Sequence, residues 1–338
     1  MSSKAGTRRD ERVITPLRIV GLVATVVALY LLAPSIARAF SEFPRLRELD
    51  PVWMGASLVM EAASFVSLWW LLTIVLRTRK WFAVATSQLA SNAVSRAIPA
   101  GAAAGAAVEY RMFATAGIDT TRAGSGLTAA TLLQYATLFA LPVIALPATL
   151  GSGVARRLEA AAWIGAGAFV IVVGLGALLL FTDRPLAAVG RAIQWLINRM
   201  PWRKTDVTQL PTRLRRERNR VRKALGRTWW QALLASVGKW ALDYFALLAA
   251  LAAVGTQANP VLILLAYTAS AVLTMIPITP GGLGFVEAGL TAMLVLAGVD
   301  ASDAILATLD YRLVSFWLPL PAGAIAAWLF RRRVVAAT

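Results

Sequence analysis

Long apolar stretches, each of at least about 17 residues, recur along this chain, and charged residues collect between them. Helices that cross a bilayer need such stretches and keep their charges in the flanking segments. The composition agrees, because 58% of the 338 residues are hydrophobic and only 15% are charged. The sequence therefore predicts an all-α polytopic membrane protein and excludes a soluble enzyme fold.

The residue types that are missing narrow the possible chemistry. The chain has no His and no Cys, which excludes disulfides, histidine bases and thiol nucleophiles and argues against a zinc site. It also lacks the phosphate-binding G-x-x-x-x-G-K-S/T loop of ATP-driven motors. We therefore expect no cofactor, no metal and no enzymatic activity.

Basic residues outnumber acidic ones, with 34 Lys and Arg against 17 Asp and Glu. Much of the excess lies beside apolar stretches, so it indicates membrane topology and contact with anionic lipid rather than with nucleic acid. The segment 183–227 is especially basic, and apolar side chains recur at helical spacing between Leu186 and Met200. This spacing predicts a helix in the membrane interface, or one that rests on the protein itself within a cytoplasmic loop.

We expect six crossing helices, at about residues 19–37, 52–76, 126–150, 160–181, 229–254 and 314–330. The first follows a basic arm at 1–18 and is long enough for a signal anchor rather than a cleaved signal peptide. Residues 19–333 then form one transmembrane domain, followed by a short tail at 334–338.

Two further apolar blocks, at 81–117 and 260–298, are interrupted near their middle. Proline and glycine break helices, so each block predicts two short helical pieces that meet at a turn. The breaks are Pro99 with the GAAAG run at 101–105, and the IPITPGGLG run at 276–284.

The two blocks match each other in sequence. Ile98, Pro99, Val108 and Glu109 stand 178 residues before Ile276, Pro277, Val286 and Glu287, and residues 116–119 recur in similar form at an offset of 181. The order of a span, a broken block and a span is also shared. We interpret 52–150 and 229–330 as the two copies of an internal duplication.

Positive charge beside a span indicates the cytoplasmic side. We assign four basic segments to the cytoplasm: the basic arm, the turn at 77–80, the loop at 183–227 and the Arg run at 331–333. All four can lie on that side only if each broken block enters and leaves the membrane on the same side. The two blocks then open from opposite sides, as two re-entrant helical hairpins of an inverted repeat. Both termini are expected in the cytoplasm.

The two broken blocks also carry a family resemblance. The second block reads IPITPGGLGFVEAGLTAMLVLAGVD and is followed by LDYRLVSFWLPLPAG, and the first block reads SNAVSRAIPAGAAAGAAVEYRMFATAGID. These stretches, the first block more weakly, resemble the flippase-like transmembrane family typified by the membrane domain of bacterial lysylphosphatidylglycerol synthase. The resemblance covers about residues 20–333 and implies a lipid substrate. The resemblance does not extend to the synthase's aminoacyl-transferase domain, so it does not imply lysine transfer. The first block also lacks the Pro-Gly-Gly of the second.

Charged residues within apolar segments are candidates for a site, because each costs about 2.5–3.5 kcal/mol on insertion scales. Glu109 and Glu287 hold matching places after the two breaks, where they either serve a transported species or cap free backbone N–H groups. Arg96 is a candidate ligand for a lipid phosphate. Arg111 is either a second ligand or an anchor at the membrane surface.

Three further charges lie inside the spans at 52–76 and 229–254. Lys239 and Asp243 stand four residues apart on one helical face and are expected to neutralise each other. Glu61 is the repeat equivalent of Lys239, which predicts a contact between the two across the pseudo-twofold axis. Arg312, at the start of the last span, is either an outer-leaflet anchor or a head-group ligand.

The breaks themselves are candidates for close contact with a substrate, or else for tight helix packing, because glycine lets backbones approach. These positions are Pro99, Gly101, Gly105, Pro280, Gly281, Gly282 and Gly284.

We therefore expect a protein that flips or scrambles a phospholipid or lipid-linked intermediate across the bacterial inner membrane, through a cavity between the hairpins. One alternative is an accessory subunit that anchors a lipid- or glycan-modifying enzyme. Another is an enzyme acting on a lipid phosphate, which the absence of His and of clustered Asp disfavours.

Overall fold

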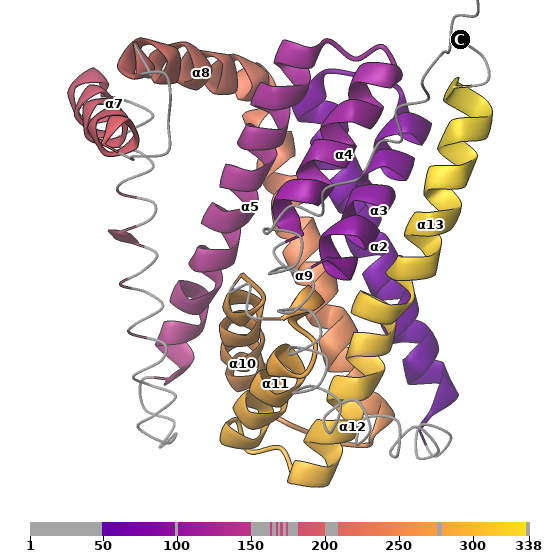
Figure 1. Cartoon of the computed structure of the whole chain (residues 1–338). Coiled ribbons are helices and arrows are strands. Elements are labelled where there is room, and N and C mark those ends of the chain that lie inside the picture. Colours follow the sequence, from indigo (N-terminus) through magenta and orange to yellow (C-terminus); the bar gives the residue numbers. More distant parts are fainter. Residues whose placement is uncertain are drawn as a thin grey trace, which may run out of the picture.

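The computed structural model describes residues 49–98, 101–149, 182–199, 209–275 and 279–335, with a few positions between 163 and 174 (Figure 1). All regular structure within these residues is helical. The basic arm, the expected first crossing, most of the crossing at 160–181, Pro99 and residues 336–338 fall outside the described residues.

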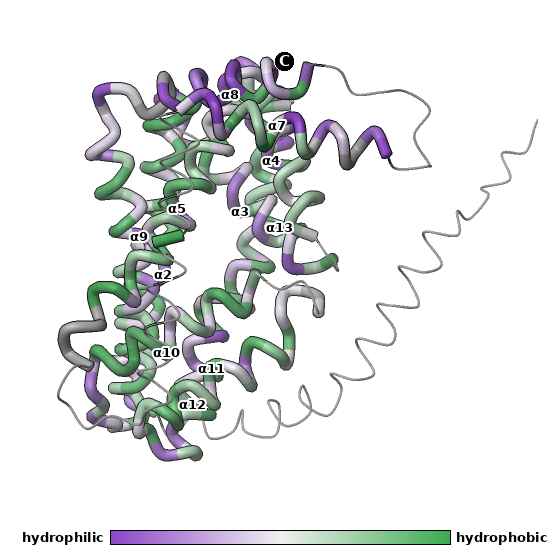
Figure 2. The backbone as a smooth tube through the Cα atoms, turned by 90° about the vertical axis from the view of Figure 1, so that its left-hand side faces the viewer, coloured by the Kyte–Doolittle hydropathy of each residue, from purple (hydrophilic) through white to green (hydrophobic). Residues whose placement is uncertain are grey.

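Within the described part, four helices are long and apolar enough to cross a membrane: Pro51–Leu76, Thr120–Ile144, Gly226–Ala253 and Ala301–Val334. They correspond to four of the six expected crossings and identify a multi-pass membrane protein. Figure 2 shows apolar residues along much of the bundle and polar residues gathered at its upper end.

The four long helices contain α2 (Pro51–Leu76), α5 (Thr120–Thr149), α9 (Trp229–Ala253) and the run from α12 (Ala301–Arg312) to α13 (Pro319–Phe330). The last run begins well before the expected position near 314. The reason is that α12 continues into α13 through the π-helical turn η4 (Leu313–Trp317) without a break.

Shorter apolar helices fill the two interrupted blocks. α3 (Trp81–Ala97) packs against α4 (Ala102–Thr115), and α10 (Pro260–Leu273) packs against α11 (Phe285–Leu296). The turn before α11 contains the 3₁₀ segment η3 (Pro280–Gly282).

Each short pair begins and ends at one end of the molecule. In the first, Lys80 Nζ donates to the carbonyl of Ala116 over 2.7 Å, which places the start of α3 beside the end of α4. In the second, Thr256 Oγ1 donates to Asp303 Oδ2 over 2.7 Å, which joins the segment before α10 to the start of α12. The two pairs lie at opposite ends of the bundle (Figure 1).

The two halves of the described bundle run in opposite directions. α2 and α9 lie side by side, and the N–H of Asp50 before α2 donates to the carbonyl of Ala253 at the end of α9 over 3.1 Å. α3 packs on α13, while α10 packs on α5. Each short pair is therefore held by a long helix of the other half, as a twofold relation between inverted repeats requires.

Local sequence explains several helix ends. Asp50 and Asn259 each accept a hydrogen bond from the second residue of the following helix, over 2.8 and 2.9 Å, and each is followed by proline. α2 ends at Arg77 with φ 50°, and α9 ends before Gly255 with φ 75°. These two C-terminal positions are 178 residues apart, so the repeat extends to the helix caps.

Two buried apolar clusters surround the short pairs. One joins Val84 of α3 and Phe113 of α4 to α2, α5, α8 (Leu210–Leu225) and α9, and the other joins α10 and α11 to α5, α9 and α12. Three residues of the first cluster have a counterpart 181 positions later in the second. The pairs are Phe113 and Leu294, Ile118 and Val299, and Ala123 and Ala304.

The basic loop folds into two helices across the upper end, α7 (Asp183–Asn198) and α8 (Leu210–Leu225). α8 packs on α5 and α2 and buries Val221, while α7 packs on α8 and buries Leu186. One face of α7 thus rests on the protein, whereas Trp195 remains 60% exposed. The helix therefore rests on the protein, and its placement in the membrane interface stays a prediction.

A candidate substrate cavity

A cavity of about 340 Å³ lies between α2, α3, α9, α10, η3, the start of α11 and the end of α12 with η4. This volume is within the range of about 300–1,000 Å³ that is usual for ligand pockets. Six of the residues singled out in the sequence line it, namely Glu61, Arg96, Lys239, Asp243, Gly281 and Arg312.

The cavity is lined by both halves of the sequence. Four pairs of its lining residues stand at the repeat offset of 178, which are Glu61 and Lys239, Phe65 and Asp243, Asn92 and Ser270, and Arg96 and Thr274. The two halves therefore contribute the same positions to one shared wall. The residue types differ within each pair, so the charge distribution of the cavity is asymmetric.

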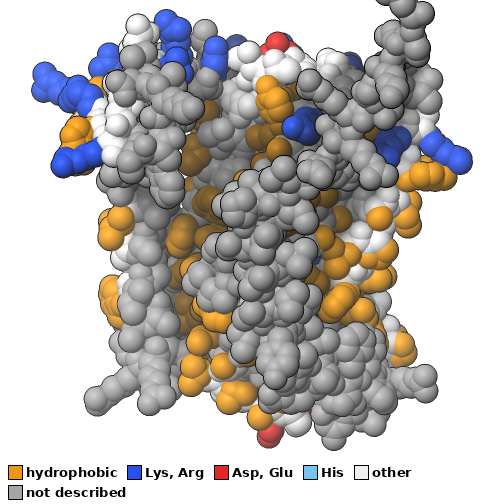
Figure 3. All heavy atoms as spheres, in the orientation of Figure 1, with side chains coloured by type: hydrophobic (Ala, Val, Ile, Leu, Met, Phe, Trp, Pro, Cys, Tyr) orange, Lys and Arg blue, Asp and Glu red, His pale blue; other side chains and the backbone are white. Residues whose placement is uncertain are grey.

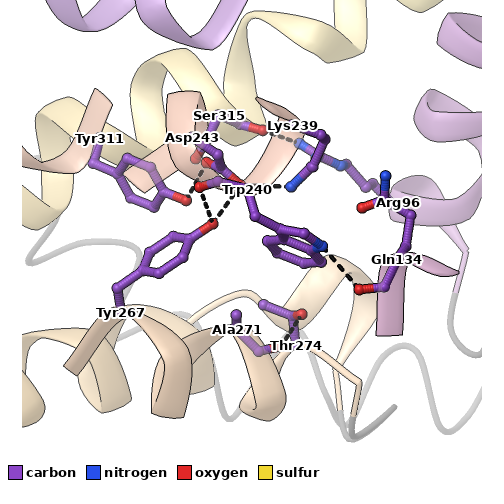
Figure 4. A network of polar contacts seen from close by, with 10 residues as sticks. All are labelled: Arg96, Gln134, Lys239, Trp240, Asp243, Tyr267, Ala271, Thr274, Tyr311 and Ser315. Carbon is purple, nitrogen blue, oxygen red and sulfur yellow. Dashed lines mark hydrogen bonds and ion pairs between the residues drawn. The ribbon is translucent and has the colours of Figure 1, made fainter. Parts of the chain in front are cut away.

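Asp243 is the centre of a polar network (Figure 4). Its Oδ2 accepts from Lys239 Nζ over 2.6 Å and from the Tyr267 hydroxyl over 2.9 Å. Its Oδ1 accepts from the Tyr311 hydroxyl over 2.7 Å. The expected pairing of Lys239 with Asp243 is confirmed, and three elements, α9, α10 and α12, meet at this carboxylate.

Lys239 and Glu61 line the same cavity, but the ammonium of Lys239 is engaged elsewhere. It pairs with Asp243 and lies 3.6 Å from the centre of the Trp240 ring. Trp240 in turn donates from Nε1 to the carbonyl of Gln134 on α5 over 2.9 Å. The expected contact between Glu61 and Lys239 stays a prediction.

A second ion pair borders the cavity. Arg312 donates from Nε to Glu287 Oε1 over 2.8 Å and from Nη2 to the carbonyl of Gly281 over 3.3 Å. Its guanidinium also lies 4.3 Å from the centre of the Phe316 ring. Arg312 is thus fixed inside the protein at 6% exposure rather than placed at the surface as an anchor.

Two cavity charges remain without an ion pair in the described structure. Arg96 donates to the carbonyl of Ser315, and its guanidinium lies 5.2 Å from the centre of the Phe316 ring. Glu61 is 6% exposed, and its Oε2 has no hydrogen-bond partner among the described residues. Unpartnered buried groups of this kind are costly and mark candidate functional positions.

The glycines of the two breaks have different surroundings. Gly281, Gly282 and Gly284 have φ of 59°, 73° and 76°, a region that favours glycine. Gly101 and Gly105 instead pack against α3, where a Cβ on Gly105 would lie 2.6 Å from the carbonyl oxygen of Ser91. Tight packing therefore explains the GAAAG run, whereas the second break forms a turn beside the cavity, beginning at Pro280.

Glu109 and Arg111 do not line the cavity. Glu109 is buried on α4 with Oε1 unpartnered, and Arg111 is exposed on the same helix. Among the described residues no backbone N–H donates to Glu109 or Glu287, but residues 99–100 and 276–278 of the two breaks lie outside them, so the capping alternative stays open. The two matched carboxylates have different environments, since only Glu287 pairs with an arginine.

Sequence reasoning missed several lining residues, namely Asn92, Trp240, Tyr267, Ser270 and Phe316. Aromatic residues in apolar helices are indistinguishable from packing residues by pattern alone. Asn92 and Ser270 had a usable feature, because both are polar and stand at the repeat offset. The described residues contain no group of acidic side chains that could hold a metal ion.

Comparison with known proteins places this fold in context. A family model described as the lysylphosphatidylglycerol synthase TM region matches residues 18–323. A UPF0104 membrane protein of Methanothermobacter thermautotrophicus is 32% identical over 99 residues, which are 29% of this chain and 28% of the relative. Another, of Methanocaldococcus jannaschii, is 40% identical over 67 residues, or 20% and 29% of the two chains. The matched regions thus span less than a third of the length of these relatives. Because both relatives are archaeal, the expected location in a bacterial inner membrane stays a prediction.

Proposed function

Because the chain belongs to the family of the lysylphosphatidylglycerol synthase transmembrane region, we propose that it moves a phospholipid or lipid-linked intermediate between the two leaflets of a membrane. This family is linked to lipid flipping. The observation that carries the proposal is a cavity that is lined by charges from both halves of the sequence.

In this proposal the two short helix pairs are re-entrant hairpins that enter the bilayer from opposite sides. Their antiparallel placement supports this, as do the bonds that bring the two ends of each pair together. Irregular backbone at membrane depth needs burial in protein or a watery cavity. The turn at Gly281 meets that condition, because it borders the cavity.

Arg96 and Arg312 are the residues that would hold a lipid phosphate. Both guanidinium groups lie over Phe316, and guanidinium binds phosphate through paired N–H donors. The head group would then cross inside the cavity while the acyl chains stay in the bilayer. Moving a charged head group through hydrocarbon without such a path is costly.

The basic end of the molecule is assigned to the cytoplasm. Figure 3 shows Lys and Arg side chains gathered at the upper end and hydrophobic side chains along the flank. Arg77, Lys80, α8 and the Arg run at 331–333 all lie at this end. The positive-inside rule then places the α10–α11 pair on the outer side.

Reconstitution into liposomes tests the proposal. Purified protein should transfer fluorescent phospholipid from the inner to the outer leaflet without partners, and Arg96→Gln should slow the transfer at least tenfold while the protein remains folded. Head-group cleavage would favour a lipid-phosphate enzyme instead. Neither transfer nor cleavage would favour an accessory subunit.

A further inference from the structure

Glu109 is a buried carboxyl group that has no part in the cavity. It lies on α4 at 9% exposure, and its Oε1 has no hydrogen-bond partner among the described residues. It does not line the cavity, and no ion pair between described residues includes it. A buried carboxylate without a cationic partner is costly, so Glu109 is a candidate for a function of its own.

Serine residues of α3 face Glu109. α3 and α4 pack antiparallel, and a Cβ on Gly105 would lie 2.6 Å from the carbonyl oxygen of Ser91. Glu109 stands one turn after Gly105, and the Ser91 side chain lies beside its carboxyl group. Ser87, one turn before Ser91 on the same face of α3, is fully buried with an unpartnered hydroxyl in the described structure. These three side chains, Ser87, Ser91 and Glu109, form a polar cluster between the two helices.

The ligand that suits this cluster is a proton. Metal cations with oxygen ligands, such as Ca²⁺ and Mg²⁺, take about six or more of them. The cluster offers only two carboxyl oxygens and two hydroxyls, because the carbonyls of α3 and α4 beside it are bonded within the helices. A proton needs one free oxygen, which Oε1 provides, and a protonated carboxyl group can donate to a nearby hydroxyl.

No neighbouring charge in the described structure neutralises Glu109. α4 packs mainly on α3 and α5. The charged and titratable residues of these three helices, apart from Glu109 itself, are Arg96, Tyr110, Arg111, Arg122 and Tyr135. Arg96 is bonded to the carbonyl of Ser315, and the other four are exposed. The charge at this position therefore depends on the proton that Glu109 itself carries.

The cluster is linked to the cavity through α3. Ser95 and Arg96 line the cavity, and Gly105 packs so closely that a Cβ there would overlap Ser95 Oγ. Neutral Glu109 is compatible with this dry contact, whereas the ionised form requires water and favours separation of α4 from α3. Glu109 lies seven residues before Ala116 at the basic end of the pair, about 10 Å along the helix. Separation at that end is enough to bring water to the carboxyl group.

We propose that Glu109 holds a proton while α3 and α4 are packed together and releases it to the basic side when they separate, so that lipid translocation depends on the pH of that side. In this step the O–H bond of the carboxyl group breaks, the proton passes to water, and no electrons are exchanged. This inference rests on the proposed lipid translocation and adds its regulation by protons.

The test measures transfer of labelled phospholipid in liposomes that contain the full chain. One linked proton can change an equilibrium by up to about tenfold per pH unit, so transfer should rise at least about fivefold from about pH 6 to about pH 8. Raising the pH only on the side that α8 faces should give the same response. Glu109→Gln, which stays neutral, should keep the low rate throughout. Asp119→Asn, a change of an exposed carboxylate near the same end of α4, should respond as the wild type does.

A second readout does not require transfer. Infrared spectra of the purified wild-type protein should contain a C=O band of a protonated carboxyl group that disappears as the pH rises, and Glu109→Gln should lack this component. If Glu109→Gln does not fold, Ser91→Ala removes only the neighbouring hydroxyl and should shift the midpoint of the band by about half a pH unit or more.

The outcomes separate this inference from the proposed function. Wild-type transfer that is equal at all pH values would overturn the inference while leaving lipid translocation standing. A pH response that folded Glu109→Gln retains would overturn it as well, as would a response to sodium concentration at constant pH. Absence of any transfer at every pH would instead overturn the proposed function, and the infrared band would still decide whether Glu109 binds a proton.

Discussion

Glu287 and Glu109 hold matching places in the two repeats, yet only Glu287 has a cationic partner. Duplication preserves the position of a residue, whereas its neighbours are free to change afterwards. Arg312 has Thr131 as its counterpart at the offset of 181, so the first half has no equivalent cation there. The sequence could therefore show that the two carboxylates correspond, but not that their environments differ.

Glu287→Gln should destabilise the protein, because it leaves the buried Arg312 without its carboxylate. Removing one partner of a buried ion pair costs about 3–5 kcal/mol, and the partial exposure of Glu287 favours the lower end. The melting temperature in detergent measures this. Glu109→Gln, which breaks no ion pair, should lower it less, and the double variant Glu287→Gln with Arg312→Gln should recover part of the loss. Equal melting temperatures for the two single variants would contradict the pairing.

Gly281→Ala should impair both folding and transfer. Gly281 has φ 59°, and an added Cβ would overlap the ring of Phe316, on which Arg96 and Arg312 lie. Backbone strain of this kind costs about 1–3 kcal/mol. Gly55→Ala on α2, where a Cβ meets nothing within 4 Å, is the matched control and should leave the melting temperature unchanged or slightly raised. A normal transfer rate for Gly281→Ala would show that the turn does not position the two arginines.

At the scale of elements, the short helix pairs depend on the opposite half for support. α3 lies against α13, and Gly323 allows this approach because a Cβ there would be 2.5 Å from that of Ala93. Most helix limits follow from local rules that the sequence shows, such as the Asp50 and Asn259 caps. The packing of each short pair on a long helix of the other half could not be predicted from local sequence, because it depends on contacts between residues far apart in the chain.

Gly323→Leu should separate α13 from α3 and lower the melting temperature. Inserting a large side chain into a close helix contact typically costs about 1–3 kcal/mol. Gly55→Leu makes the same change at an open position on α2 and should have little effect. Similar losses in both variants would indicate a general effect of leucine rather than loss of the α3–α13 contact.

The contact between α7 and α8 should weaken in acid. Arg218 pairs with Asp183 over 2.7 Å, and this hydrogen bond holds the pKa of Asp183 below its ordinary 3.8. Because the folded-state pKa is the lower one, the stabilisation is present above pH 3.8 and is lost as the pH falls through the lowered value. Spin labels at Val189 and Arg213 should move apart in that range. Asp183→Asn should abolish this pH dependence, and a dependence that persists would exclude Asp183 as its cause.

At the scale of the whole molecule, the sequence predicted the inverted halves from three features: the repeat offset, the broken blocks and the basic segments. The cavity was predicted only as a place between the halves. The polar residues that line it could not be predicted from the sequence, because Tyr267 and Trp240 are indistinguishable from packing residues until their hydrogen-bond partners are known. Asp243 was assigned a partner on its own helix, but its two tyrosine donors come from other elements.

Orientation in the membrane can be measured directly, since the chain has no native cysteine. Single cysteines at Arg213 and at Ser302, both exposed, should react with an impermeant thiol reagent from the cytoplasmic and the outer side respectively. Gly255→Cys should match Ser302→Cys, because both positions lie at the α10–α11 end. Labelling of Ser302→Cys from the cytoplasmic side alone would contradict the inverted arrangement.

The central claim is that lipid head groups pass through the charged cavity, and blocking that cavity tests it most directly. Ser64 is a buried lining residue of α2, so Ser64→Cys places one thiol inside the cavity. After complete modification by a small thiol reagent, verified by mass spectrometry, lipid transfer in liposomes should fall to the rate of protein-free vesicles. Gly55→Cys, modified equally at an open position on the same helix, should keep its rate. Undiminished transfer by fully modified Ser64→Cys would contradict passage through this cavity.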